Sequence, residues 1–278
     1  MKGKPVHRLL VVLDREFQKD LGFEAVKILQ KAWQAKVTFL IVLHENLQKI
    51  LSLDLKQVIE ETRKRFEVHL PPGAEIVVEV GDLRERVLIA LEAYEADILV
   101  FFGIPDTRHM KVIRSSPKPV WVIHSEKPFP GENIGVPLAL KPRDQLALDW
   151  ARNLKEAFGG RVLGLRFYSV PGRDFIASLN LADSLEEVDQ QFEAMQHQEI
   201  EAFLKEIRRQ TVLDEVIVEQ DSPKSGIVRA VEEHDIGVLI MTLRKPGVLE
   251  QLFFGTVTEA VLHHLPTHIL VVPVEQKA

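Results

Sequence analysis

The stretch LIMTLRKPGVLEQLFFGTVTEAVLHHLPTHILVV covers residues 239–272. Its branched apolar runs at both ends predict two buried β-strands of a parallel sheet. The loop between them contains Gly247 and Gly255, together with the basic residues Arg244 and Lys245. Phosphate-binding loops in this position are usually richer in glycine, because glycine lets backbone N–H groups approach the phosphate oxygens. The loop is therefore a working phosphate loop, a degenerate one, or only a connection.

Predicted strands and helices alternate along the whole chain, and the same order occurs twice. Amphipathic stretches, such as residues 20–35 and 142–158, separate the strands and have apolar residues at mostly helical spacing. This alternation predicts right-handed βαβ units and hence a parallel sheet. The predicted strands are RLLVVL, VTFLIVL, EIVVEV, DILVFF and PVWVI in the first copy, and NIGVPLA, RVLGLRF, EVIVEQ, GVLIMT and THILVV in the second.

Two local matches set the register of the repeat. ALEAYEADILVFF at residues 90–102 aligns with AVEEHDIGVLIMT at residues 230–242, with an offset of 140 residues. SPKPVWVI at residues 116–123 aligns with LPTHILVV at residues 265–272, where the offset is 149 residues. The two offsets differ by nine residues, so the first copy has a shortened loop, GIPDTRHMKVIRSS, after its fourth strand.

Composition and charge exclude several classes of function. The net charge of -6 and the pI near 6.0 give no electrostatic reason to expect nucleic acid or an anionic membrane as a partner. The chain has no Cys, which excludes disulfides, thiolate catalysis and cysteine-based metal sites. No apolar stretch approaches the ~20 residues of a membrane span, and the first apolar run meets Asp14 too early for a signal peptide. We therefore expect a cytoplasmic protein.

Three parts of the pattern carry a resemblance to a known family. They are the first strand ending in VVLD, the third strand followed by Gly81 and Asp82, and the segment LFFGTVTEAVLHHLPTHILVV. Together they resemble the universal stress protein family in its tandem two-domain form. The resemblance implies an α/β fold of two Usp-like (adenine nucleotide alpha hydrolase-like) domains, each a five-stranded parallel sheet flanked by helices. We place them at residues 1–127 and 128–278, divided by the linker SEKPFPGEN.

The resemblance also implies how the two domains meet. In single-domain relatives two chains commonly pair through their last strands, which run antiparallel. Here PVWVIHS and THILVVPV would be the two edge strands, and their pairing would protect both edges. We expect a pseudo-twofold dimer within one chain, and hence a monomer, with Trp121 sealing the seam.

ATP-binding members of the family carry G-x-x-G, nine further residues and then G-[ST], with an Asp that ends the first strand near the ribose. In the second half the resemblance puts the glycines of the first pair at Thr242 and Lys245, and the final pair at Gly255 and Thr256. The Asp position falls on Ala139. The second-half motif is therefore degenerate, with Lys245 as a point charge that could replace a lost glycine amide.

The first half has kept a different part of the motif. Asp14 and Gly81 are present, but the shortened loop has no G-[ST] pair. Neither half has a complete site, and Thr256 is also the N-cap of a capping box with Glu259. The nucleotide-binding candidates are Gly255, Thr256, Lys245, Thr242, Asp14 and Gly81.

The histidines do not predict a metal or catalytic site. His263, His264 and His268 are close in sequence, but their spacing does not force their nitrogens to converge. His44 ends the second strand next to an acidic residue, and neighbouring strand residues point to opposite faces. His109 lies in the shortened loop with no evident partner.

From these features we expect a cytoplasmic, non-enzymatic stress-response module that requires no cofactor. Residual ligand binding, with ATP, ADP or AMP as the ligand, is expected mainly in the second half. One alternative is an ATP-binding protein with slow ATP hydrolysis or phosphate transfer, which would use Gly255, Thr256 and Lys245. A second alternative is an adaptor that binds a protein or an apolar metabolite, and an exposed apolar patch along residues 175–185 would favour it.

Overall fold

A computed structural model gives the architecture of the chain. It describes residues 6–13, 19–44, 55–67, 70–170, 182–206, 212–244 and 257–274. No helix in these ranges is both long enough and apolar enough to cross a membrane.

The predicted strands are all present, with ends that differ from the prediction by a few residues at most. The first half contains, in order, β1 (Arg8–Val12), α1 (Lys19–Trp33), β2 (Lys36–Leu43), α3 (Leu55–Glu67), β3 (Glu75–Val80), α4 (Leu83–Ala93), β4 (Ile98–Phe102), α5 (Thr107–Ser115) and β5 (Val120–Ile123). The second half contains β6 (Asn133–Pro137), α6 (Asp144–Phe158), β7 (Val162–Tyr168), α8 (Ala182–Glu206), β8 (Glu215–Gln220), α9 (Pro223–Glu233), β9 (Ile236–Arg244), α10 (Val257–His264) and β10 (His268–Val274).

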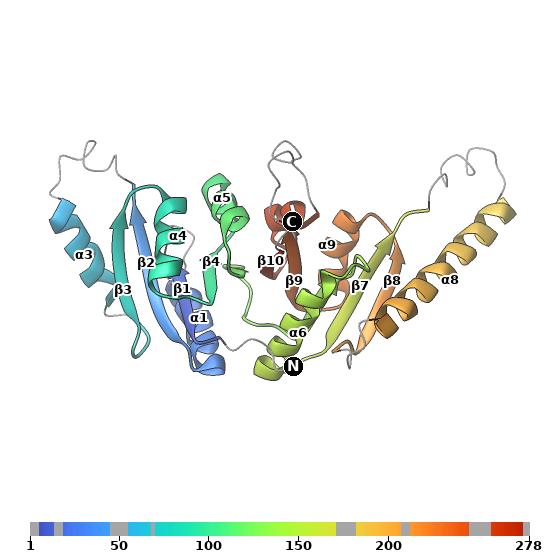
Figure 1. Cartoon of the computed structure of the whole chain (residues 1–278), viewed down its shortest axis with the longest axis horizontal. Coiled ribbons are helices and arrows are strands. Elements are labelled where there is room, and N and C mark those ends of the chain that lie inside the picture. The colour runs from blue at the N-terminus through green and yellow to red at the C-terminus, as the bar shows by residue number, and fades with distance from the viewer. Residues whose placement is uncertain are drawn as a thin grey trace.

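The described strands form one ten-stranded sheet in the order β3-β2-β1-β4-β5-β10-β9-β6-β7-β8 (Figure 1). Each half repeats the same order, and the two halves meet at β5 and β10. Neighbouring strands are parallel within each half, whereas β5 and β10 are antiparallel, with Trp121 opposite Leu270. The predicted α/β fold is confirmed, and the two last strands pair as expected.

Helices cover both faces of the sheet because its strands are apolar on both sides. One apolar layer joins α1 and α6 to the sheet, and Val26 and Leu148 are among its buried residues. The other layer joins α4, α5, α9 and α10 to the opposite face, through residues such as Val112 and Val261. Consecutive strand residues contribute to opposite layers, as Leu9 and Leu10 do in β1.

We call the β5–β10 contact and the side chains packed around it the seam. Trp121 lies in this seam, as expected. The side chain of Trp121 is fully buried. Its ring centroid lies 5.7 Å from that of Trp33, 5.2 Å from that of Phe129 and 6.3 Å from that of Phe158. Trp33 of α1 also donates a hydrogen bond from Nε1 to Oδ1 of Asn153 in α6, at 3.1 Å. The aromatic cluster therefore joins the first helix of each half.

The description of residues 103–116 as only a shortened loop is wrong. The segment contains α5, which stands before β5 as α10 stands before β10. The nine residues that the first half lacks therefore lie in front of the helix, and the apolar face of the helix covers the sheet. Met110, Val112 and Ile113 of α5 are all buried.

Candidate functional site

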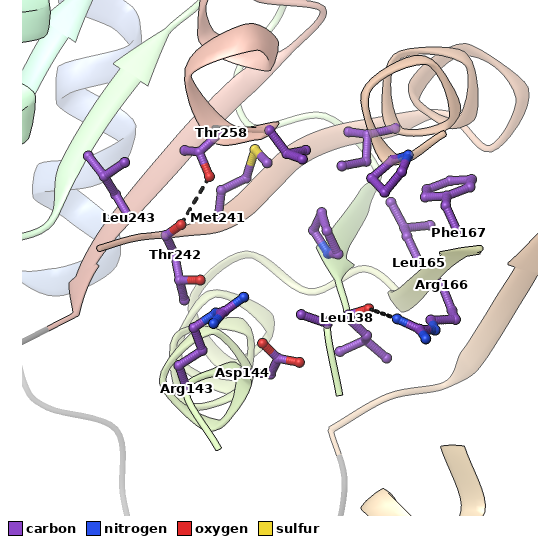
Figure 2. Close-up of a pocket in the computed structure, with 15 residues that line it drawn as sticks. Leu138, Arg143, Asp144, Leu165, Arg166, Phe167, Met241, Thr242, Leu243 and Thr258 are labelled. Atoms are coloured by element: carbon purple, nitrogen blue, oxygen red, sulfur yellow. Dashed lines mark hydrogen bonds between the residues drawn. The ribbon is translucent and has the colours of Figure 1, made fainter. Parts of the chain in front are cut away.

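A pocket of about 320 Å³ lies in the second half, at the carboxyl ends of β6, β7 and β9 (Figure 2). The strand order of this half reverses at β6, which lies between β7 and β9. Open α/β sheets usually bind ligands at such a point. The residues that line the pocket are Pro137, Leu138, Ala139, Arg143, Asp144, Leu165, Arg166, Phe167, Pro223, Ile227, Met241, Thr242, Leu243, Val257 and Thr258.

One wall of the pocket is apolar. Leu165 and Phe167 of β7 are two residues apart, so they point to the same face of the sheet, and Ile227 of α9 and Met241 of β9 join them. All four side chains are buried. Gly226 makes this packing possible, because a Cβ at that position would lie 2.4 Å from Cδ1 of Phe167. This wall suits an apolar part of a ligand, such as an aromatic ring.

Thr242 and Thr258 form the edge of the pocket nearest to α10. The side chain of Thr258 donates a hydrogen bond from Oγ1 to the carbonyl oxygen of Thr242, at 3.0 Å. This bond ties the first turn of α10 to the end of β9. It holds a helix N-terminus, where negative charge is favoured, beside the pocket.

Asp144, the first residue of α6, is a buried carboxylate that sequence reasoning missed. The backbone N–H of Lys141 donates to its Oδ2 at 3.2 Å, and the backbone N–H groups of Ala139 and Leu140 also contribute hydrogen bonds. Burial raises the pKa of Asp144 above its ordinary value, and these hydrogen bonds and the charge of Arg143 offset the rise only in part. The carboxylate holds the turn between β6 and α6 in shape. An Asp just after a Lys-Pro-Arg turn was the available signal.

Two arginines border the pocket and differ in their partners. Arg166 donates from Nε to Oε1 of Gln196 in α8, at 2.9 Å, and more weakly to the carbonyl oxygen of Leu138. Arg143 makes no side-chain hydrogen bond to the described residues, and Figure 2 shows its guanidinium directed toward Thr242. The lining thus has two guanidinium groups and one carboxylate. Its electrostatic balance favours an anionic group beside Arg143.

At the corresponding place in the first half, the N-terminus of α5 is capped by a side chain of the chain itself. By the offset of 149 residues, Asp106 stands where the second half has Gly255. The carboxylate of Asp106 accepts hydrogen bonds from the backbone N–H groups of Arg108, at 2.8 Å, and His109, at 3.0 Å. Burial acts to raise the pKa of Asp106, but the Arg108 guanidinium and the two N–H groups hold it well below its ordinary value. A carboxylate therefore already occupies the helix N-terminus that would face a phosphate.

Comparison with known proteins identifies the family. The sequence model of the Universal stress protein family matches residues 131–273, the half that contains the pocket. The chain belongs to this family. No curated protein sequence matches it significantly.

Solved universal stress protein structures have the same fold over nearly the whole length of this chain. A universal stress protein from Archaeoglobus fulgidus superposes with a TM-score of 0.63 at 16% identity, over 98% of this chain and 97% of that one. A protein of unknown function from Pseudomonas aeruginosa gives a TM-score of 0.61 at 14% identity, over 96% and 92% of the two chains. A putative universal stress protein from Pseudomonas aeruginosa gives 0.59 at 15% identity, over 96% and 93%. At such low identity the likeness is one of fold.

The sequence candidates of this universal stress protein fall into two groups. Thr242 lines the pocket. Gly81 follows β3 in the other half and is not among the lining residues; its φ is 146°, and a Cβ there would lie 2.7 Å from Nε of Arg86. Asp14, Lys245, Gly255 and Thr256 lie outside the described residues, as do residues 175–181 of the proposed apolar patch.

The three histidines near the end of the chain lie in different surroundings. His263 and His264 are exposed on α10, whereas His268 is buried in β10. The ring of His268 contacts the backbone of residues at the seam: Nδ1 accepts from the N–H of His124 at 3.1 Å, and Nε2 lies 3.0 Å from the carbonyl oxygen of Pro128. The expectation that His109 has no partner is wrong, because its Nδ1 completes the capping box with the N–H of Asp106.

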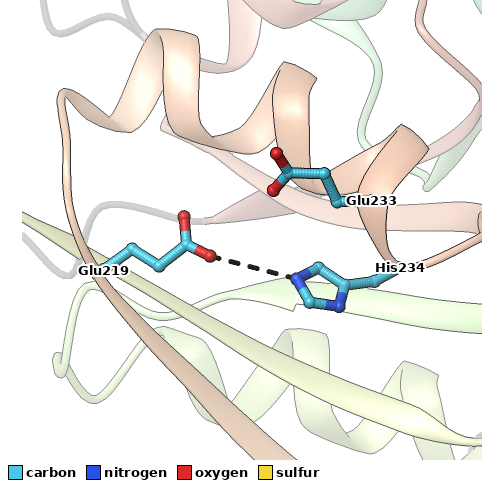
Figure 3. A group of neighbouring side chains, drawn as sticks. All are labelled: Glu219, Glu233 and His234. Atoms are coloured by element: carbon cyan, nitrogen blue, oxygen red, sulfur yellow. Dashed lines mark ion pairs between the residues drawn. The ribbon is translucent and has the colours of Figure 1, made fainter.

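One group of side chains in the described ranges has metal-ligand character. Ligand atoms of Glu219, Glu233 and His234 lie within 4.8 Å of one another (Figure 3). The guanidinium of Arg229 already pairs with this group, at 2.7 Å from Glu219 and 3.5 Å from Glu233. It also lies 2.7 Å from Asp221. A cation of the chain itself thus compensates the carboxylates, so we interpret the group as an ion-pair network between β8 and α9.

Proposed function

We propose that this universal stress protein is a cytoplasmic, non-enzymatic stress-response module that binds a small ligand in its second half. The observation that carries the proposal is the difference between the two halves. Asp106 fills the helix N-terminus of the first half, whereas a pocket of about 320 Å³ adjoins the matching helix of the second half. The first half then acts as a scaffold that covers the edge strand of the second.

The lining supports a ligand with an apolar ring system and an anionic group. Phe167 and Met241 belong to the apolar wall, and the guanidinium of Arg143 provides a positive charge at the rim. An adenine nucleotide has both parts, and the pocket volume is at the lower end of the ~300–1,000 Å³ typical of ligand pockets. Ala139 stands where ATP-binding relatives have an Asp near the ribose, so we expect weaker binding than in those relatives.

A binding role is favoured over catalysis by the chemistry of the described lining. Its titratable side chains are Arg143, Asp144 and Arg166. Hydrolysis of ATP needs a group that positions or deprotonates water. The carboxylate of Asp144 is buried and already accepts backbone hydrogen bonds, which makes it a poor candidate for that task.

Two measurements test the proposal. The protein is purified without added nucleotide and denatured, and the released small molecules are identified by mass spectrometry. The purified protein is then titrated calorimetrically with AMP, ADP and Mg-ATP, and ATP turnover is followed in parallel. We expect binding without turnover. Absence of both a co-purified ligand and nucleotide binding would reject the ligand-binding role.

Two substitutions locate the site and separate the proposal from its rival. Asp14→Ala in the first half should leave nucleotide affinity unchanged. Thr256→Ala should cost mainly the stability of a helix cap, about 1 kcal/mol. If Thr256→Ala instead abolishes a measurable ATP hydrolysis of the wild type, the ATP-hydrolysing alternative is correct.

A further inference from the structure

An ion pair connects the first half to the helix beside the second-half pocket. Nε of Arg114 in α5 lies 2.7 Å from Oε1 of Glu259 in α10. The two side chains are 29% and 12% exposed, so water and salt screen this pair less than a pair on the open surface.

Glu259 lies in the first turn of α10, the helix turn that borders the pocket. It is the third residue of α10 and follows Thr258, which lines the pocket and is bonded to the carbonyl oxygen of Thr242. A lone negative charge in this turn would oppose an anionic ligand group beside Arg143. The ion pair with Arg114 supplies the opposite charge, and it comes from the other half of the chain.

The contact has no symmetric twin. By the offset of 149 residues, Arg114 corresponds to His263, and Met110 corresponds to Glu259. A pair related to Arg114–Glu259 by the repeat would therefore join Met110 to His263, which cannot form an ion pair. Met110 is buried and His263 is exposed. A cation of the first half thus compensates an anion of the second half, and the repeat provides no equivalent ion pair in the opposite sense.

We propose that Arg114 is a positioning residue through which the first half sets the affinity of the second-half pocket for anionic ligands. This inference rests on the proposed ligand-binding function and adds a regulating contact to it. The first half would then contribute to ligand binding in the second half, although Asp106 caps the helix N-terminus of the first half.

The test compares two probes that differ by one phosphate, AMP and adenosine, on the full chain. Arg114→Gln should weaken AMP binding by on the order of ten-fold, because the variant removes the positive charge that lies 2.7 Å from the partly buried Glu259 carboxylate. Adenosine affinity should change by less than about two-fold, because the uncharged probe does not sense the carboxylate. The double variant Arg114→Gln with Glu259→Gln should restore AMP affinity to near the wild-type value, and Arg114→Lys should retain most of it.

Each other outcome has a definite meaning. If Arg114→Gln weakens AMP and adenosine equally, Arg114 only supports the structure and the inference is wrong. If the double variant does not recover AMP binding, charge compensation is not the mechanism. If Arg114→Gln fails to fold by circular dichroism, Arg114→Lys and Glu259→Gln decide. Arg114→Lys should retain most of the wild-type AMP affinity, and Glu259→Gln should bind AMP at least as tightly as the wild type. Wild-type protein that binds neither probe removes the proposed function, and this inference with it.

Discussion

Protonation of His268 should weaken the folded state of this protein as the pH falls. The imidazole is fully buried in β10 at the seam. Burial lowers the pKa of His268 to about 4, although the hydrogen bond to the Pro128 carbonyl acts against the shift; the nearby His124 and Lys127 add to it. Nδ1 accepts a hydrogen bond from the backbone N–H of His124, so a proton on Nδ1 would also break that bond.

The sign and size of the effect follow from this depressed pKa. The unfolded pKa is about 6.5, so the stabilisation is present above pH 6.5 and is lost as the pH falls toward 4. A difference between about 6.5 and about 4 is worth roughly 3 kcal/mol in total, of which about 2 kcal/mol is lost between pH 7 and pH 5.

The assay is urea unfolding at pH 7 and pH 5 for the wild type and for His268→Gln. The variant should be less stable at pH 7, because it disturbs the Pro128 and His124 contacts, but it should lose about 2 kcal/mol less than the wild type on acidification. Because other groups titrate in both proteins, only the difference between the two pH dependences is interpreted. Equal losses in the two proteins would refute the reasoning.

Three further substitutions test the packing and capping arguments. Gly226→Ala should destabilise by about 1–2 kcal/mol in thermal unfolding and weaken AMP binding, because its Cβ would press on the Phe167 ring and push it toward the pocket; an unchanged melting temperature would contradict this. Asp106→Ala should lower the free energy of unfolding by about 1–2 kcal/mol, because the α5 cap is lost. It should not create a second binding site, and a calorimetric stoichiometry near one AMP per chain would verify this. Trp121→Ala should cost about 3–5 kcal/mol in urea unfolding, because it empties the centre of the aromatic cluster; a loss below ~1 kcal/mol would show that the cluster does not hold the seam.

The sequence alone was sufficient for much of the architecture, because the features concerned are local or repeated. Runs of branched apolar residues, as in EIVVEV and EVIVEQ, locate β3 and β8 with their observed ends. The two offsets locate the seam strands, and the bulk of Trp121 in one of them indicates what fills the seam. Thr242, which the resemblance to the family put at a motif glycine position, lines the pocket, and its role in binding stays a prediction.

Only the tertiary structure located the second-half pocket and showed how the halves are coupled. That Asp106 fills a helix N-terminus depends on α5 forming where the sequence indicated a loop. Asp144 acquires its role because the chain turns back over it and removes it from water. Arg114 and Glu259 are separated by 145 positions in the sequence, and neither has a local pattern that names the other. Their contact arises because pairing of β5 with β10 brings α5 beside α10, and electrostatic partners are chosen by such proximity in space and not by spacing along the chain.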